Sequence, residues 1–295
     1  MQDNSTHTKM NNGSKHPKLE PFSGLVPPYT RSEEDVWAEL SKVIDEKDSK
    51  VRTLKPVYSK AIFKYAVAAV VAIMIGLPMF MRFYTNTIYV GYGEHAEVML
   101  PDDSKVDLNA DTKLSYHPYW WKFNREVKME GEAYFEVTKG NSFTVKSEMG
   151  ETTVLGTSFN IYTRDNAYTV ACLTGAVKVS DYTSDVVIKP NQKADLVENN
   201  GLVVYDNVPV KDAVSWINNE FIYTGEQLSK VISDIELQYN IHISFSKSVR
   251  VDTFTYTGSF DRSLSAENVL YFVFKPFGLK TMEKGKGEYE IAYEN

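Results

Sequence analysis

Most of the chain mixes polar and apolar residues, but the stretch from Ala61 to Met81 is almost entirely apolar. It contains a single charged residue, Lys64, near its beginning. A helix of this length, rising ~1.5 Å per residue, covers the ~30 Å hydrocarbon core of a bilayer. A buried core helix and a cleaved signal peptide are the alternatives, but the stretch begins far from the N-terminus and ends without a small-residue cleavage site. We therefore predict a transmembrane helix over residues 61–82.

The charged residues that flank this stretch indicate its orientation. Six Lys and Arg residues lie between positions 47 and 64, whereas Arg82 is the only one on the other side before Lys105. Cytoplasmic flanks of membrane helices carry the excess of Lys and Arg. We therefore expect a single-pass inner-membrane protein whose N-terminus is cytoplasmic and whose C-terminal bulk is periplasmic.

The cytoplasmic segment, residues 1–60, contains one stretch with helical periodicity. About the first twenty residues are polar and are predicted to be disordered, because they bury too little apolar surface to offset chain entropy. Ser32 is a typical N-cap residue, three acidic residues follow it directly in the sequence, and apolar residues then recur at helical spacing. This pattern predicts an amphipathic helix over about residues 32–48. Its apolar face consists of Val36, Trp37, Leu40, Val43 and Ile44.

A lone helix of this length is marginally stable in water, so its apolar face needs a partner. A soluble cytoplasmic protein would bury that face, and the bilayer surface or a second copy of the helix are the alternatives.

Beyond the apolar stretch, the spacing of apolar residues changes to every second position. Short alternating segments such as Ala96 to Leu100, separated by turns rich in glycine, follow one another over residues 88–207. This predicts an all-β periplasmic domain, arranged as a sandwich, a barrel or a solenoid-like stack. Residues 208–295 change pattern again, with helices expected at about Glu226–Tyr239 and Ser265–Lys275, each between two strands. That order predicts a small α+β domain with two β-α-β units, so the fold class is multidomain.

Composition and motifs argue against several functions. The net charge of −7 and the pI near 5.4 give no basic surface for direct binding to nucleic acid. The five histidines are too scattered to suggest a metal site, and no phosphate loop or nucleophile motif occurs, so we expect no metal, cofactor or catalytic residue. The single cysteine, Cys172, lies in an alternating segment and is expected to be a buried apolar side chain.

Two clusters are candidate sites. The neighbours Asp102 and Asp103 follow Pro101, which is typical of a turn rather than of a catalytic carboxylate pair. The rings of Tyr119, Trp120 and Trp121 could form a platform for a sugar, or they could belong to a loop folded onto the β core.

Five blocks of the exterior sequence resemble, in order and spacing, the FecR family of transmembrane anti-sigma regulators. The blocks are Val98–Asn109, Arg125–Val137, Ser142–Val145, Val154–Ile161 and Gly175–Val179. The tail from Trp216 resembles the C-terminal domain common in that family, which is related to the signalling domain of secretins and of TonB-dependent outer-membrane transporters. The first hairpin has Asp102-Asp103 where the family usually has Asp-Gly, and the cytoplasmic segment carries one helix where many relatives carry several.

The resemblance implies a relay. The signalling domain of a substrate-loaded TonB-dependent transporter would contact the periplasmic part, and the cytoplasmic segment would then release or activate an extracytoplasmic-function sigma factor, with proteases as further partners. The five apolar residues of the cytoplasmic helix are then the expected sigma-factor contact. Whether the regulation inhibits or activates is open. A membrane-tethered periplasmic glycan-binding module that uses Tyr119, Trp120 and Trp121 is the alternative function.

Overall fold

The computed structural model describes residues 31–48 and 60–294. The disorder expected for about the first twenty residues, and the cations Lys50, Arg52 and Lys55, lie outside the described residues. The chain divides into two compact units, Met1–Ala66 and Val67–Asn295.

The first helix, α1 (Glu33–Asp48), matches the helix expected over about residues 32–48. Ser32 caps it, because the Ser32 hydroxyl oxygen accepts a hydrogen bond from the backbone N–H of Asp35 at 3.3 Å. Glu33, Glu34 and Asp35 occupy the first turn, where the partial positive charge of the helix dipole favours acidic side chains.

The second helix, α2 (Lys60–Phe83), contains the apolar stretch. Within it, Ile62–Phe83 are 22 apolar-rich residues, and the most apolar 18-residue window among them has a mean hydropathy of 2.1 and no buried residue. A helix of this length and composition can span a membrane. Pro78 lies inside this helix near its C-terminal end.

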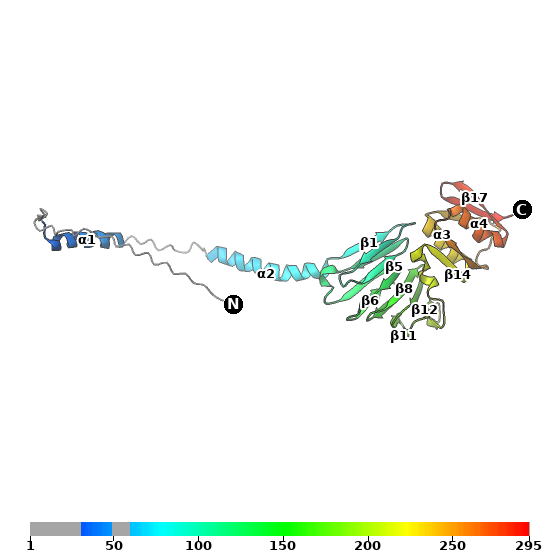
Figure 1. The fold of residues 1–295 in the computed structure, drawn as a ribbon, viewed down its shortest axis with the longest axis horizontal. Helices are drawn as coiled ribbons and strands as arrows, with labels where there is room; N and C mark the ends of the chain where they lie inside the picture. Colours follow the sequence, from blue (N-terminus) through cyan, green and yellow to red (C-terminus); the bar gives the residue numbers. More distant parts are fainter. Residues whose placement is uncertain (1–30, 49–59, 295) are drawn as a thin grey trace, which may run out of the picture. The chain divides into compact units, whose positions relative to one another are not determined.

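Thirteen strands follow α2 and confirm the expected β-rich domain. They are β1 (Asn86–Val90), β2 (Ala96–Met99), β3 (Lys105–Leu108), β4 (Thr112–Tyr116), β5 (Arg125–Glu136), β6 (Phe143–Lys146), β7 (Glu151–Val154), β8 (Ser158–Arg164), β9 (Ala167–Cys172), β10 (Val177–Ser180), β11 (Asp185–Ile188), β12 (Gln192–Val197) and β13 (Gly201–Tyr205). The strand order β11-β10-β7-β6-β5-β8-β9-β12-β13 places β6, β5 and β8 side by side (Figure 1).

The long strand β5 belongs to both halves of this sheet. Its first half pairs with β4 and β6, and its second half pairs with β3 and β8. The change of partners occurs at Gly131, where φ is +115° and an added Cβ would lie 2.5 Å from the Thr112 hydroxyl oxygen. Only glycine fits this bend without displacing Thr112.

The two halves enclose a single hydrophobic core, as the alternating apolar positions predict. Phe135, Phe143 and Phe159 are among its largest fully buried side chains, and the rings of Phe135 and Phe159 stack with centroids 5.1 Å apart. The thirteen strands form one hydrogen-bonded sheet around this core, and the choice among sandwich, barrel and solenoid-like stack stays a prediction.

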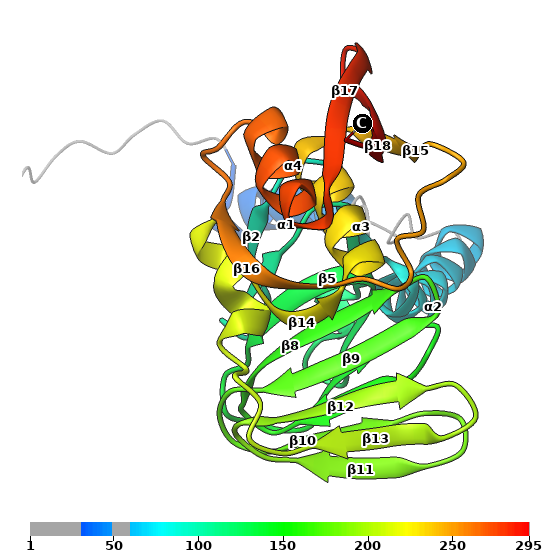
Figure 2. The same ribbon diagram turned by 90° about the vertical axis from the view of Figure 1, so that its right-hand side faces the viewer.

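The C-terminal region has its own core, built from two helices between two small sheets (Figure 2). After the 3-10 helix η2 (Asp212–Asn218) come β14 (Glu220–Gln227), α3 (Leu228–Tyr239), β15 (His242–Phe245), β16 (Thr255–Asp261), α4 (Ala266–Phe274), η3 (Lys275–Phe277), β17 (Leu279–Gly285) and β18 (Glu288–Tyr293).

The element order agrees with the predicted strand–helix–strand repeat, but the strand pairing differs. β14 pairs with β16 in an antiparallel sheet, whereas β15, β18 and β17 form a separate three-stranded sheet. Each helix therefore crosses from one sheet to the other and does not connect parallel neighbours of one sheet. Each helix contributes one buried face to the shared core: Leu228, Val231, Ile232 and Ile235 on α3, and Val269, Leu270, Val273 and Phe274 on α4.

Candidate functional site

The β domain and the C-terminal region meet through a chain of polar side chains. The amide nitrogen of Gln238, on α3, donates to the Asn109 carbonyl oxygen at 2.7 Å. The amide of Asn109 donates to one carboxylate oxygen of Glu132 at 2.8 Å, and the amide of Asn160 donates to the other at 2.9 Å. The imidazole Nε2 of His95 lies 2.9 Å from the Gln238 carbonyl oxygen. We call these five residues the polar junction.

Main-chain and aromatic contacts reinforce the polar junction. The N–H of Gly93 donates to the carbonyl of Leu237 at 2.8 Å, and the Arg262 guanidinium donates to the Gly93 carbonyl. The rings of His95 and Trp216 meet edge to face at 5.4 Å. Two short segments of the β domain are thus attached to the end of α3.

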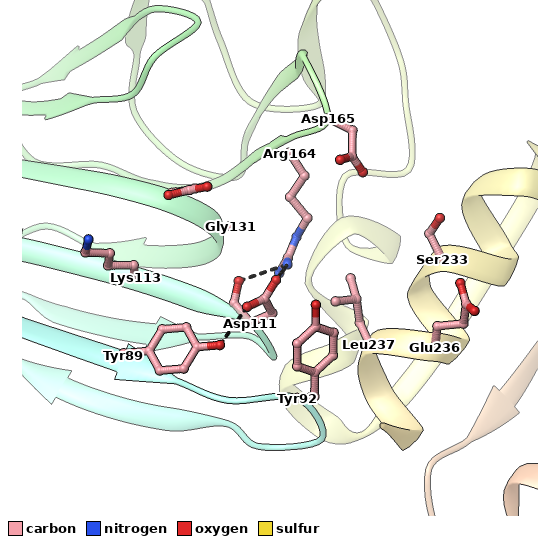
Figure 3. Close-up of a pocket in the computed structure, with 11 residues that line it drawn as sticks. Tyr89, Tyr92, Asp111, Lys113, Gly131, Arg164, Asp165, Ser233, Glu236 and Leu237 are labelled. Carbon is pink, nitrogen blue, oxygen red and sulfur yellow. Dashed lines mark hydrogen bonds and ion pairs between the residues drawn. The ribbon is translucent and has the colours of Figure 1, made fainter. Parts of the chain in front are cut away.

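Two adjacent cavities lie along this boundary, of about 390 Å³ and about 610 Å³. Both are lined by Arg164, Asp165, Ser233 and Leu237, so they form one cleft. Figure 3 shows the smaller cavity, where residues of α3 face Tyr92 and Arg164 across the boundary.

Two cations that line the cleft, Arg164 and Lys230, lie beside carboxylates. The Arg164 guanidinium lies 3.6 Å from a carboxylate oxygen of Asp111 and donates to the Asp111 main-chain carbonyl at 2.9 Å (Figure 3). The Lys230 ammonium donates to Asp234 at 2.9 Å and lies 4.4 Å from the centre of the Tyr162 ring.

Lys230 and Glu132, which line the larger cavity, have shifted pKa values. Desolvation opposes the charge on Lys230, but Asp234, Tyr162 and Glu132 outweigh it and raise the pKa of the ammonium. Burial raises the pKa of the Glu132 carboxyl, against the opposing effects of Lys230 and Asn160. Within residues 31–48 and 60–294, no three His, Cys, Asp or Glu side chains are grouped as a metal site would need. The cleft therefore has the character of a polar domain boundary.

The five residues expected to contact a sigma factor all lie on α1, where their side chains are between 37% and 66% exposed. Helical spacing puts them on one face, as the sequence indicates. The residues are Val36, Trp37, Leu40, Val43 and Ile44.

The aromatic residues weighed as a ligand platform do not form one surface. Trp121 is only 4% exposed and contacts Tyr116 and Phe143 edge to face, at 5.7 Å and 5.9 Å. Tyr119 is 51% exposed, and Trp120 lies with it in the short 3-10 helix η1 (Pro118–Trp120). The structure thus assigns Trp121 to the β core and leaves Tyr119 and Trp120 outside it.

The aspartates after Pro101 form a turn, as expected. The Asp102 carboxylate accepts hydrogen bonds from the Arg125 guanidinium, one of them at 2.7 Å, and from the Ser104 N–H at 3.2 Å. Asp103 takes a left-handed conformation with φ of 61°. Cys172 is fully buried, also as expected, and burial raises the pKa of its thiol to about 11.

Comparison with family models shows which proteins share this arrangement. A model described as "FecR protein" matches residues 86–178, and one described as "FecR, C-terminal" matches residues 220–273. The chain belongs to the FecR family. Membership of the FecR family indicates a regulatory rather than an enzymatic role. A search of curated proteins finds no match.

Two solved structures are similar to this FecR-family chain. Both are crystal structures described as a candidate anti-sigma factor from Parabacteroides distasonis, each with 28% sequence identity and a TM-score of 0.66. They cover 72% and 71% of this chain and 100% of their own chains.

Sequence reasoning missed the polar junction. In the sequence, Asn109 ends a family block and Gln238 lies within the predicted helix Glu226–Tyr239. Their signal is weak, because a buried amide looks like any surface amide until its partner, 129 positions away in the chain, is known.

Proposed function

We propose that this chain is a single-pass inner-membrane regulator of an extracytoplasmic-function sigma factor. Its periplasmic part would receive a signal from an outer-membrane TonB-dependent transporter, and its cytoplasmic part would pass that signal to transcription. The observation that carries the proposal is the FecR family match to both exterior regions, joined in one chain to an apolar helix and an amphipathic helix. The related structures described as a candidate anti-sigma factor support the same assignment.

The sigma-factor contact is assigned to the apolar face of α1. All five of its large apolar side chains are exposed, although an amphipathic helix of sixteen residues is marginally stable without a partner. A groove on the sigma factor that accepts this face would bury side chains whose transfer from water contributes about 1.5 to 3 kcal/mol each. Folding or stabilisation of α1 on binding would then be part of the interaction.

The transporter contact is assigned to the C-terminal region. Its three-stranded sheet has β15 and β17 at its edges, and the end strand of a sheet can accept a strand from a partner. A signalling domain of the transporter could pair with one of these edges. Proteolysis of the regulator, with regulatory proteases as partners, would be one route by which that contact releases the sigma factor.

The proposed orientation has the N-terminus in the cytoplasm and the C-terminal bulk in the periplasm. It is supported by the excess of cations before α2 over the single Arg82 at its end. A reporter fused after Asn295 tests it: alkaline phosphatase should be active there, whereas a fluorescent protein that matures only in the cytosol should be dark. The opposite result would overturn the relay.

Co-purification tests the function itself. The full chain, extracted in mild detergent, should bring down the extracytoplasmic sigma factor encoded beside it, and a transporter signalling domain added from outside should change the amount of sigma factor retained. If sigma factor is absent from the purified chain and its transcriptional output is unaffected by deletion of the chain, the proposed function is wrong.

The glycan-binding alternative has less support. A stacking platform needs neighbouring rings on one accessible surface, and Trp121 is buried in the β core. Titration of the chain with envelope glycans, followed by tryptophan fluorescence, would revive the alternative only if the signal responds and the response is lost in Trp120→Ala.

A further inference from the structure

Aromatic rings gather where α2 ends and the β domain begins. Tyr84 lies 5.4 Å from Phe80 and 5.2 Å from Tyr119, measured between ring centroids, and Phe80 lies 6.0 Å from Tyr119. Trp120 and Phe123 follow in the same loop, with their centroids 4.6 Å apart. We call Tyr119, Trp120 and Phe123, together with Phe80 and Tyr84, the aromatic collar.

Strand pairing fixes the collar at the end of α2. β1 begins two residues after Tyr84, and its first residue, Asn86, pairs with Tyr116, the last residue of β4. The loop that follows β4 must therefore return beside the helix end. The His117 imidazole lies 3.0 Å from the Tyr84 carbonyl oxygen and adds a direct link. The buried Trp121 anchors the same loop in the core.

Four of the five collar rings are exposed to an unusual degree for large apolar side chains. Phe123 is 72% exposed, Phe80 is 54%, Tyr119 is 51% and Tyr84 is 43%. Phe123 carries no hydrogen-bonding group, so water solvates it poorly. Contiguous exposed apolar residues of this kind mark a surface that contacts a partner or a membrane.

We infer that the aromatic collar lies in the headgroup layer of the outer leaflet of the bilayer that α2 spans, so that the base of the β domain contacts the membrane. The inference rests on the proposed membrane span of this chain. The collar is continuous with that span, since two of its rings belong to the last turn of α2 and the residue that follows it. Trp and Tyr are enriched at this depth, because an amphipathic ring has an apolar body and a polar edge.

The positive charges around the collar also suit contact with lipid headgroups. The Arg82 guanidinium lies 5.7 Å from the centre of the Trp120 ring, and Lys122 is an exposed neighbour in the loop. Long cationic side chains at the end of a membrane helix extend toward lipid phosphates while their methylene groups stay in the apolar layer. The base of the β domain would thus be held against the bilayer by contacts at two places, the helix and the loop.

Such an attachment has a consequence for signalling. A domain joined to its helix only by a flexible residue could not transmit a change of orientation, whereas the loop and helix here share ring contacts and the His117 link. A force or rotation applied to the β domain would reach α2.

Photocrosslinking in the full chain tests the inference. Benzoylphenylalanine would replace Phe123, Leu77 or Tyr182 in turn, and each variant would be placed in nanodiscs of phosphatidylethanolamine and phosphatidylglycerol. Leu77 lies inside the proposed span and reports on the membrane insertion of α2. Tyr182 is the matched control, because it is an 85% exposed ring whose hydroxyl donates to the Glu148 carbonyl. Glu148 follows β6, which starts beside the Arg125 end of β5, so Tyr182 lies at the far end of these strands from the collar.

Lipid adducts are expected at positions 77 and 123 and not at 182. An adduct at 77 without one at 123 would overturn the collar and leave the membrane span intact. The absence of an adduct at 77 would overturn the span and, with it, the collar.

A second measurement is hydrogen exchange: nanodiscs should slow exchange in residues 118–124 of the native chain, and Phe123→Asp should remove that protection without lowering the unfolding temperature. If residues 118–124 exchange equally fast in the native chain and in Phe123→Asp when both are in nanodiscs, that result would also contradict the inference.

Discussion

Helices α1 and α3 carry the same kind of apolar face and have opposite surroundings. On α3, Leu228, Val231 and Ile235 are fully buried, in a core that the chain itself completes with two small sheets. On α1, the corresponding side chains are exposed, Trp37 by 66%. Spacing alone does not distinguish the two helices. The difference is that α3 packs into a core formed by its own region, whereas the proposed sigma factor would have to cover the apolar face of α1.

The largest effect is expected where α1 would meet that partner. Trp37→Ala combined with Leu40→Ala should weaken sigma-factor binding by roughly 3 to 6 kcal/mol, at about 1.5 to 3 kcal/mol for each fully buried side chain. A loss of 3 kcal/mol already lowers affinity more than about 100-fold. Co-purification and titration with labelled sigma factor measure it.

The control for this variant is Lys42→Ala, a change on the polar side of α1. It should leave binding unchanged, and neither variant should alter the thermal unfolding of the exterior region. If the double variant binds as tightly as the native chain, the contact assignment on α1 is wrong.

The next largest effect is expected in α3. Ile235→Ala removes a fully buried side chain and should lower the free energy of unfolding by about 2 to 5 kcal/mol. For a region of this size, each kcal/mol corresponds to about 2 to 4 °C in the unfolding temperature. Thermal unfolding of the full chain in detergent, followed by tryptophan emission, measures the shift.

Leu40→Ala provides the matching truncation on α1. Because Leu40 is 46% exposed and outside the exterior core, its truncation should not move the same transition. Equal shifts in Ile235→Ala and Leu40→Ala would show that α1 is not the unpartnered helix described here.

This comparison also shows what the sequence predicts well. The apolar stretch, the amphipathic helix and the element order of residues 86–294 were predictable, because each depends on residues close together in the chain. The strand order of the large sheet and the crossing of α3 and α4 between two small sheets were not. They depend on which strands pair. The alternation of apolar residues along a strand predicts which face is buried, but it does not predict which strand lies beside it.

The site residues divide along the same line. The apolar face of α1 was predictable from helical spacing, whereas the fate of the ring cluster was not. Trp120 and Trp121 are adjacent and chemically identical, yet Trp121 is buried in the β core whereas Trp120 lies outside that core, beside Arg82 at the end of α2. The pairing of Asn86 with Tyr116 decides this, and only the folded chain shows that pairing.

A polar position sharpens the comparison, because α3 also buries Gln238, which is 4% exposed. Gln238→Ala would leave the Asn109 carbonyl and His95 without the amide that joins them, at a cost of about 1 to 3 kcal/mol. The free energy of unfolding should fall by that amount, and hydrogen exchange should quicken around residues 93–95 and 109. Ser229→Ala, on the exposed side of α3, is the control. An equal response to both would mean that the polar junction does not stabilise the boundary.

The same junction should respond to pH. Burial, with a smaller contribution from Arg262, lowers the pKa of His95 below its usual value near 6.5. As the pH falls through about 6.5, the unfolded chain takes up a proton that the native chain still excludes, so stability falls. Urea unfolding of the full chain at a series of pH values measures this. His95→Gln should flatten the dependence between neutral pH and the lowered pKa, and an unchanged slope in that variant would assign the response to another group.

The smallest effects are expected at the helix caps, where the two kinds of helix can be compared by the same substitution. The Ser265 hydroxyl accepts from the Asn268 N–H at 3.4 Å at the start of α4, and Ser32 caps α1 in the same way. Ser265→Ala should lower the free energy of unfolding of the exterior region by about 1 kcal/mol. Ser32→Ala should leave that transition unchanged and instead reduce the helicity of α1, and with it the affinity for the sigma factor, because an unpartnered helix must be ordered when it binds. Thermal unfolding and the sigma-factor titration separate the two outcomes. A Ser32→Ala chain that binds with native affinity would show that α1 is already fully formed before it meets its partner.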